Sequence, residues 1–172
     1  MANTYTLISS VTVGATAVAT IDFSSIPATY TDLVLKMSLR TNRAGSFDYA
    51  TINFNNSSAD YTLRVVEGTG GAAVSFTRST FGVNLIARAD GATATANTFG
   101  NAEMYIPNYA SANYKSISVD GAQEDNVVGA YIDSFAGLWS QTAAINQLTI
   151  TNGTGNSYVQ YSTATLYGIS NA

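Results

Sequence analysis

The chain contains no cysteine and no histidine, and only 10% of its residues are charged. Without histidine it lacks the usual general base near neutral pH, and without cysteine it lacks a thiol nucleophile. The same two residue types provide most zinc ligands, so the ordinary zinc sites are excluded as well. We therefore expect a protein that is not an enzyme, with no catalytic residue, no cofactor and no metal, whose function is to bind.

Positive charge is also scarce, because seven Lys and Arg stand against eleven Asp and Glu, for a net charge of -4. Binding of nucleic acid through phosphate neutralisation needs a basic patch, so we expect no nucleic-acid partner. No stretch approaches the roughly 20 apolar residues that span a bilayer, and the first residues lack the pattern of a signal peptide. We expect a soluble protein with no membrane partner and no cleaved leader.

Hydrophobic residues are abundant, at 46% of the chain, and they occur in short alternating runs. In the clearest run, residues 33–40, four apolar side chains alternate with polar ones. Such a period of two is typical of a half-buried β-strand. Similar runs occur at residues 19–23, 51–55, 63–65, 104–106, 117–119, 148–151 and 158–169.

Turn signals rich in Gly, Asn and Asp separate these runs at intervals of about ten residues, as in a sandwich or barrel. Residues 68–71 (GTGG) indicate a hairpin tip, and Asn152-Gly153 fits a type I′ hairpin turn. Long windows with helical apolar spacing are absent. We predict an all-β fold, an antiparallel β-sandwich of jelly-roll type with about ten strands.

A length of 172 residues suggests a single β-sandwich domain over residues 1–172. The first fifteen or so residues are open to two interpretations. They form either the opening strand or an N-terminal arm that attaches to a neighbouring molecule. Tyr5, Leu7 and Ile8 would anchor such an arm.

Acid–base chemistry has one candidate, the acidic group of Glu124, Asp125 and Asp133. Two carboxyl groups roughly 5–10 Å apart across a cleft would suit glycoside hydrolysis. The same oxygens would suit Ca²⁺, although no EF-hand spacing is present. The simpler interpretation is a solvated loop between two strands, and it is the one we prefer.

The aromatic residues comprise eleven Tyr, seven Phe and one Trp. Core filling and cross-strand pairing account for most of them. Those that face outward would form an interface with a partner or stack on sugar rings. The residues we expect at an interface are Tyr5, Leu7, Ile8, Tyr105, Tyr109, Tyr114 and Trp139.

Several segments resemble a family of small virion structural proteins of tailed bacteriophages. They are residues 5–10 (YTLISS), 25–35 (SIPATYTDLVL), 105–111 (YIPNYAS) with 114–115 (YK), 137–145 (GLWSQTAAI) and 161–169 (YSTATLYGI). The resemblance runs over essentially the whole chain. It implies a place in a virion and supplies no catalytic residues.

This resemblance leads to the expectation of a capsid cement (decoration) protein on the capsid surface. Such a protein binds the assembled head and not the free subunit, which stabilises the shell by mass action. The resemblance itself leaves the place in the virion open among capsid decoration, a head fibre and a tail-associated module. As a cement protein, the chain would have the major capsid protein as partner and would form a homotrimer. The alternative is a carbohydrate- or receptor-binding module of a head or tail fibre.

Overall fold

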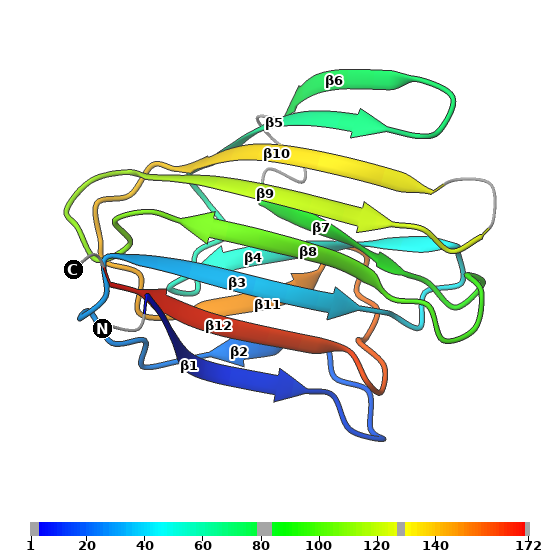
Figure 1. Ribbon diagram of the computed structural model, residues 1–172, viewed down its shortest axis with the longest axis horizontal. Coiled ribbons are helices and arrows are strands. Elements are labelled where there is room, and N and C mark those ends of the chain that lie inside the picture. Colours follow the sequence, from blue (N-terminus) through cyan, green and yellow to red (C-terminus); the bar gives the residue numbers. More distant parts are fainter. Residues whose placement is uncertain (1–3, 79–83, 127–129, 171–172) are drawn as a thin grey trace.

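The computed structural model describes residues 4–78, 84–126 and 130–170. These residues form twelve β-strands in two sheets, of eight and four strands, that pack face to face (Figure 1). Neighbouring strands pair antiparallel throughout. The predicted antiparallel β-sandwich of jelly-roll type is confirmed, with twelve strands in the described residues where the sequence predicts about ten.

Within each sheet the strands are named here in spatial order, so consecutive strands are hydrogen-bonded to each other. The eight-stranded sheet contains β1 (Tyr5–Thr12), β12 (Thr163–Ile169), β3 (Asp32–Leu39), β8 (Gly100–Ile106), β9 (Lys115–Gln123), β10 (Tyr131–Trp139), β5 (Tyr61–Gly68) and β6 (Ala73–Arg78). The four-stranded sheet contains β2 (Ile21–Phe23), β11 (Leu148–Asn152), β4 (Phe47–Phe54) and β7 (Leu85–Asp90).

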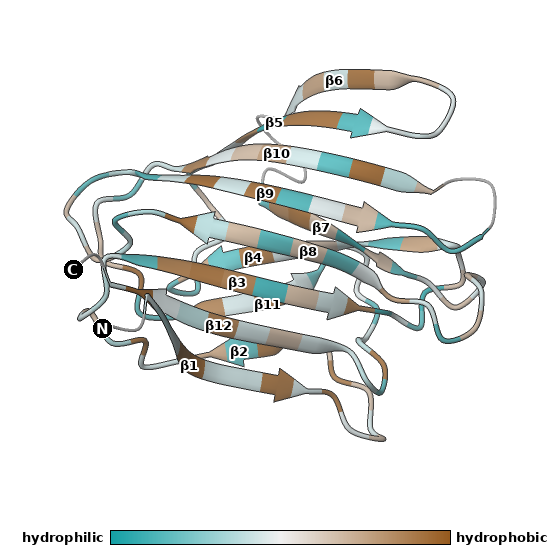
Figure 2. Ribbon diagram, viewed as in Figure 1, coloured by the Kyte–Doolittle hydropathy of each residue, from teal (hydrophilic) through white to brown (hydrophobic). Residues whose placement is uncertain are grey.

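The core lies between the two sheets and follows the period-two alternation. On β3, Leu33 and Leu35 are buried against the other sheet while Lys36 points to solvent. On β4, Ile52 and Phe54 face the core from the opposite side. Figure 2 shows the alternation as bands of opposite hydropathy along the strands. Burial of this apolar surface is the main driving force for the fold.

Two local predictions differ in outcome. The hairpin tip at residues 68–71 is confirmed, since it joins β5 to β6 and Gly70 has a φ of 79°. The hairpin at Asn152-Gly153 is wrong, because β11 lies in the four-stranded sheet and the next strand, β12, lies in the other. The loop after Asn152 therefore crosses from one sheet to the other.

The long final strand expected over residues 158–169 is also shortened, because β12 begins only at Thr163. Tyr161 has a φ of 71°, which breaks the extended conformation. Tyr158 instead makes isolated bridges to Val18 and Thr41. At the other end of the chain, residues 5–12 form β1, an edge strand paired with β12, and not a separate arm.

None of the described residues belongs to a helix long and apolar enough to cross a bilayer. The β5–β6 hairpin projects past the four-stranded sheet at the top of Figure 1. The two sheets are therefore unequal in extent, and part of the larger sheet has no partner sheet behind it.

Candidate functional site

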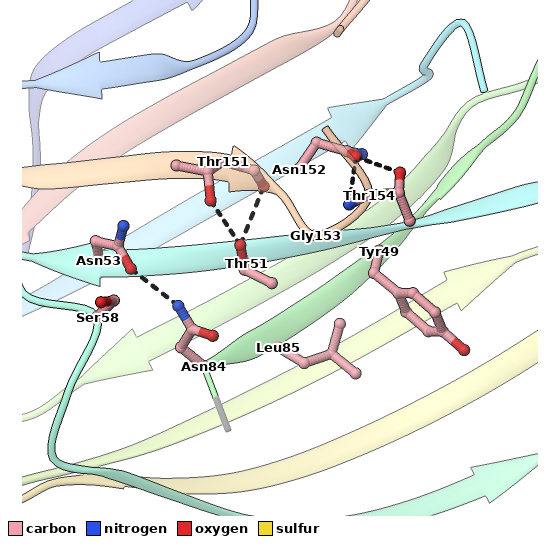
Figure 3. A pocket seen from close by; sticks show the side chains of 10 residues that line it. All are labelled: Tyr49, Thr51, Asn53, Ser58, Asn84, Leu85, Thr151, Asn152, Gly153 and Thr154. Atoms are coloured by element: carbon pink, nitrogen blue, oxygen red, sulfur yellow. Dashed lines mark hydrogen bonds between the residues drawn. The ribbon is translucent and has the colours of Figure 1, made fainter. Parts of the chain in front are cut away.

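The outward side of the four-stranded sheet carries a pocket with a volume of about 370 Å³. Because β4 alternates, Tyr49, Thr51 and Asn53 point away from the core on this side. The start of β7, the end of β11 and the β4–β5 loop close the pocket (Figure 3). The lining residues are Tyr49, Thr51, Asn53, Ser58, Asn84, Leu85, Thr151, Asn152, Gly153 and Thr154.

Hydrogen bonds across the sheet hold the polar groups of the pocket in place. The hydroxyls of Thr51 and Thr151 lie 2.6 Å apart. The amide nitrogen of Asn84 donates to Asn53 Oδ1 at 2.9 Å and to the Ile52 carbonyl at 2.8 Å. Among the described residues, Asn53 Nδ2 and Asn84 Oδ1 have no hydrogen-bond partner. Within the described residues, Asn53 Nδ2 therefore remains as a donor and Asn84 Oδ1 as an acceptor.

The crossing loop forms another wall. Asn152 Oδ1 accepts hydrogen bonds from the backbone nitrogens of Thr154, at 2.9 Å, and Asn156, at 3.2 Å. The backbone nitrogen of Gly153 donates to the Tyr49 carbonyl at 3.0 Å, which ties the loop to β4. The loop is thus ordered by its own side chains and does not need a ligand to take this shape.

One side of the pocket is aromatic. The ring of Tyr49 meets Phe47 edge to face, with centroids 5.4 Å apart. The guanidinium of Arg88, which is paired opposite Tyr49, lies 5.2 Å from the centre of the Tyr49 ring. Buried Leu85 adds an apolar contact within the pocket.

The chemistry of the lining is uniform. Eight of the ten residues carry a hydroxyl or amide side chain, and none carries a charge. The volume lies near the lower end of the roughly 300–1,000 Å³ typical of small-molecule sites. Such a pocket can exchange hydrogen bonds with a ligand rich in hydroxyls while the Tyr49 ring contacts an apolar face.

The residues predicted at an interface divide into two groups. Tyr5 is 51% exposed, Leu7 is 58% exposed and Tyr105 is also exposed, all on the outer face of the eight-stranded sheet. Tyr5 meets Tyr167 edge to face at 6.2 Å. Tyr114 is exposed as well, in the loop that joins β8 to β9.

Tyr109 and Trp139 belong to the core, with exposures of 0% and 2%. Trp139 faces the other sheet from β10 and packs against Phe54 and Tyr61. The hydroxyl of Tyr109 donates to the Pro27 carbonyl. The expectation that these two residues form an exposed surface is corrected, because both rings fill space between the sheets.

Ile8 is partly buried and packs against the core, so it anchors β1 to its own molecule. Tyr114 is held outward by its neighbour. The buried Lys115 donates from Nζ to the Ser111 carbonyl at 2.8 Å and to the Asn113 carbonyl. This ammonium therefore fixes the loop that presents Tyr114 to solvent.

The three acidic residues of the predicted group have different environments. Asp133 is buried on β10, where its Oδ2 accepts a hydrogen bond from Arg88 Nε at 2.9 Å. Glu124 is exposed and accepts a hydrogen bond from the Asn126 nitrogen in its own turn. Asp125 is buried after the end of β9. Within the described ranges, no three Asp or Glu side chains are placed to hold a metal ion.

The pocket itself was not predicted from the sequence. Its signal was present in residues 51–55, where Thr51, Asn53 and Asn55 share one face of the strand. Polar residues at alternate positions are typical of any solvated sheet face, so this pattern does not identify a pocket. The contributions of Asn84 and Thr151 depend on strand order, which the sequence does not reveal.

Comparison with known proteins adds little to this site. No protein-family model matches the chain, and no curated protein does. Among solved structures, Caenorhabditis elegans galectin LEC-6 is similar, with 12% sequence identity and a TM-score of 0.33. The match covers 94% of this chain and 96% of the galectin. An identity and a TM-score this low transfer neither a ligand nor a binding residue.

Proposed function

We propose that the protein is a non-enzymatic carbohydrate-binding module, which binds a sugar in the pocket between β4, β7 and the crossing loop. The observation that supports this proposal is the uncharged lining of hydroxyl and amide groups around a Tyr ring. Sugars present many hydroxyls, each both a donor and an acceptor, together with apolar ring faces. This lining offers the same combination in a preformed arrangement.

The Asn53–Asn84 pair is the center of the proposed recognition. Because Asn84 Nδ2 is engaged by Asn53 Oδ1, the remaining amide atoms present a donor and an acceptor to the ligand. Two neighbouring sugar hydroxyls would bind such a pair together. The Thr51–Thr151 hydroxyl pair offers a second contact of the same kind.

A panel of mono- and oligosaccharides, followed by calorimetric titration of those that bind, tests this proposal. We expect Asn84→Ala and Thr151→Val each to weaken binding by about threefold to tenfold, the effect of losing one hydrogen bond. Asn113→Ala, in the exposed loop before β9, is the matched control and leaves the affinity unchanged. Absence of binding to every sugar at millimolar concentration would contradict the proposal.

A second candidate function is that of a capsid cement protein, which binds the major capsid protein on the outside of an assembled bacteriophage head. The observation that favours it is apolar surface on the outer face of the eight-stranded sheet. Val66 is 56% exposed and Ile132 is 67% exposed there, and Leu7 lies on the same face. Contiguous exposed apolar surface marks docking sites, and Val66 and Ile132 lie on neighbouring strands of this face.

Cryo-electron microscopy of the virus particle separates the two candidates. The cement candidate requires density for this chain on the shell, whereas density on the tail or base plate alone excludes it. In sedimentation with assembled heads, Leu7→Ser and Ile132→Ser would each reduce binding. Val74→Ser, an exposed valine on the opposite face of the sheet, serves as control.

A further inference from the structure

A buried carboxylate lies directly behind the wall of the pocket. Asp48, on β4, has no exposed surface and accepts three hydrogen bonds, all from neutral donors. These come from the Thr41 hydroxyl at 2.9 Å, the Tyr49 nitrogen at 2.8 Å and the Thr154 hydroxyl at 2.8 Å. Among the described residues, no Lys or Arg forms an ion pair with it.

Two of these donors belong to the pocket, because Tyr49 and Thr154 both line it. The Thr154 hydroxyl also lies 2.6 Å from Asn152 Oδ1 and accepts a hydrogen bond from Asn156 Nδ2. A hydroxyl has a single proton, so Asp48 and Asn152 share one donor. Asp48 therefore positions the crossing loop against β4.

The charge of Asp48 reaches beyond its own hydrogen bonds. Burial raises the pKa of the Tyr158 phenol, and the nearby charge of Asp48 raises it further. The Tyr158 hydroxyl donates to the Thr151 carbonyl at 2.7 Å, and Thr151 lines the pocket. Because the carboxylate is excluded from water, its field is less screened than that of a surface charge.

A second carboxylate flanks the same face of the sheet. Asp22, on β2, accepts hydrogen bonds from the Thr149 hydroxyl at 2.7 Å and the Thr20 hydroxyl at 2.6 Å. Thr149 is paired in register with both Asp22 and Asn53, so Asp22 lies two strands away from Asn53, on the strand next to β11. No cation among the described residues pairs with Asp22 either.

The cation beside the pocket does not offset these charges. Arg88 lies against the Tyr49 ring, but it forms ion pairs with both Glu67 and Asp133. That cluster of one cation and two carboxylates contributes no net positive charge. Arg88 therefore adds no net positive charge beside the pocket, while Arg43 lies against the ring of Phe47, which is not part of the lining.

We propose that Asp48 and Asp22 make the pocket select uncharged sugars over anionic ones, with Asp48 acting also as a positioning residue for Thr154. This inference rests on the proposed carbohydrate-binding function and narrows its ligand class. Uronic acids, sialic acids and sugar phosphates are excluded by repulsion, while their neutral counterparts bind.

Matched sugar pairs test the selectivity. Glucose, galactose and mannose are each titrated against the corresponding uronic acid at neutral pH and low salt. We expect the neutral member of a bound pair to have an affinity at least about tenfold higher. Asp48→Asn and Asp22→Asn narrow that ratio, while Asp120→Asn, an exposed aspartate on the other sheet, leaves it unchanged.

Positioning is separated from charge by Thr154→Val, which keeps both carboxylates. We expect it to lower the affinity for the neutral sugar and the affinity for its uronic acid by the same factor. The ratio of the two affinities then stays that of the wild type. If Asp48→Asn fails to fold, Asp22→Asn alone tests the role of charge, because Asp22 is exposed. Added salt should then narrow the ratio of the two affinities in the wild type as Asp22→Asn does, because salt screens the charge.

Three outcomes overturn the inference. Equal wild-type affinity for both members of a pair rejects the selectivity and leaves the carbohydrate-binding proposal standing. If neither Asp48→Asn nor Asp22→Asn changes the ratio of neutral to anionic sugar affinity, these residues do not cause the selectivity. Failure of every sugar to bind rejects the carbohydrate-binding proposal, and the inference with it.

Discussion

A single arginine links the two sheets at the residue scale. Arg88, on β7 of the four-stranded sheet, pairs with Glu67 of β5 and Asp133 of β10 in the eight-stranded sheet. Its guanidinium also lies 3.7 Å from the centre of the Tyr131 ring. All three charged side chains are largely excluded from water, so each depends on the others for its charge to be tolerated.

Removing the cation from this cluster should be costly. We expect Arg88→Met to lower the free energy of unfolding by about 3–5 kcal/mol, because it leaves two buried carboxylates unpaired. Lys36→Met is the control, since Lys36 pairs with Glu103 at the exposed surface and should change stability by less than about 1 kcal/mol. Urea denaturation of both variants checks the difference, and equal losses would contradict it.

The same cluster should make stability depend on pH. Burial raises the pKa of Asp133 above its usual 3.8, and Arg88 only partly offsets this. The folded protein then holds that proton more tightly than the unfolded chain does. This contribution to stability is complete below pH 3.8 and is lost as the pH rises through the raised pKa.

Asp133→Asn removes this titration. We expect the unfolding free energy of the wild type, measured relative to Asp133→Asn, to fall as the pH rises from 3.8 through the raised pKa of Asp133. Chemical denaturation at several pH values measures the difference. A difference that stays constant across this range would show that Asp133 does not titrate in it.

At the scale of the elements, β7 and β8 approach so closely that one strand needs a glycine. A Cβ on Gly100 would lie 2.3 Å from the Arg88 backbone oxygen, which no side-chain movement can relieve. A Cβ on Gly121, in β9, would meet nothing closer than 3.4 Å. The first position is therefore restricted by the packing of the two sheets and the second is not.

We expect Gly100→Ala to lower the unfolding free energy by about 1–3 kcal/mol, or more if the strands cannot separate. Gly121→Ala should stay within about 1 kcal/mol of the wild type, because its contacts are of ordinary length. Thermal or urea unfolding of the two variants provides the comparison. Similar losses would mean that strand entropy, and not the close approach, determines the effect.

The sequence predicts most strongly those strands in which apolar and polar residues alternate. It does not predict β7, since all six of its residues are buried and no alternation remains. On β10 the inward positions include Asp133 and Gly137, which interrupt the apolar pattern. Both strands take part in contacts between the sheets, so these departures from the pattern have structural causes.

The candidate site was harder to predict than the strands. Thr51 and Asn53 lie on one strand, and their shared face follows from the alternation. Asn84 and Thr151 reach the same pocket only because β7 and β11 flank β4. Tyr109 and Trp139 were expected at an interface but are buried in the core, because the sequence pattern of an aromatic residue suits a core and an interface equally well.

At the scale of the whole molecule, the outer face of the larger sheet has exposed apolar groups at two places. Tyr5 and Leu7 lie at one edge, and Val66 and Ile132 lie near the other. Association that covers them would bury apolar surface at little conformational cost, because sheet backbones are already ordered.

Under the cement proposal we expect a homotrimer, with a mass three times the 18.0 kDa of one chain. Light scattering coupled to size-exclusion chromatography measures it. Ile132→Ser or Leu7→Ser should reduce the mass if the exposed groups form the contact, and Val74→Ser should not. A wild-type mass equal to one chain at every concentration contradicts the expected trimer.

The pairing of β1 with β12 has a mechanical consequence. The two strands are antiparallel, and Tyr5 at the start of β1 lies opposite Ile169 at the end of β12. The chain therefore enters β1 and leaves β12 at the same end of the ladder. A force that pulls these two ends apart loads the hydrogen bonds one after another, as in a zipper. A tether attached at only one end leaves the other strand unloaded. The molecule would therefore resist tension poorly when held between its two ends, and better when anchored through one end and a face.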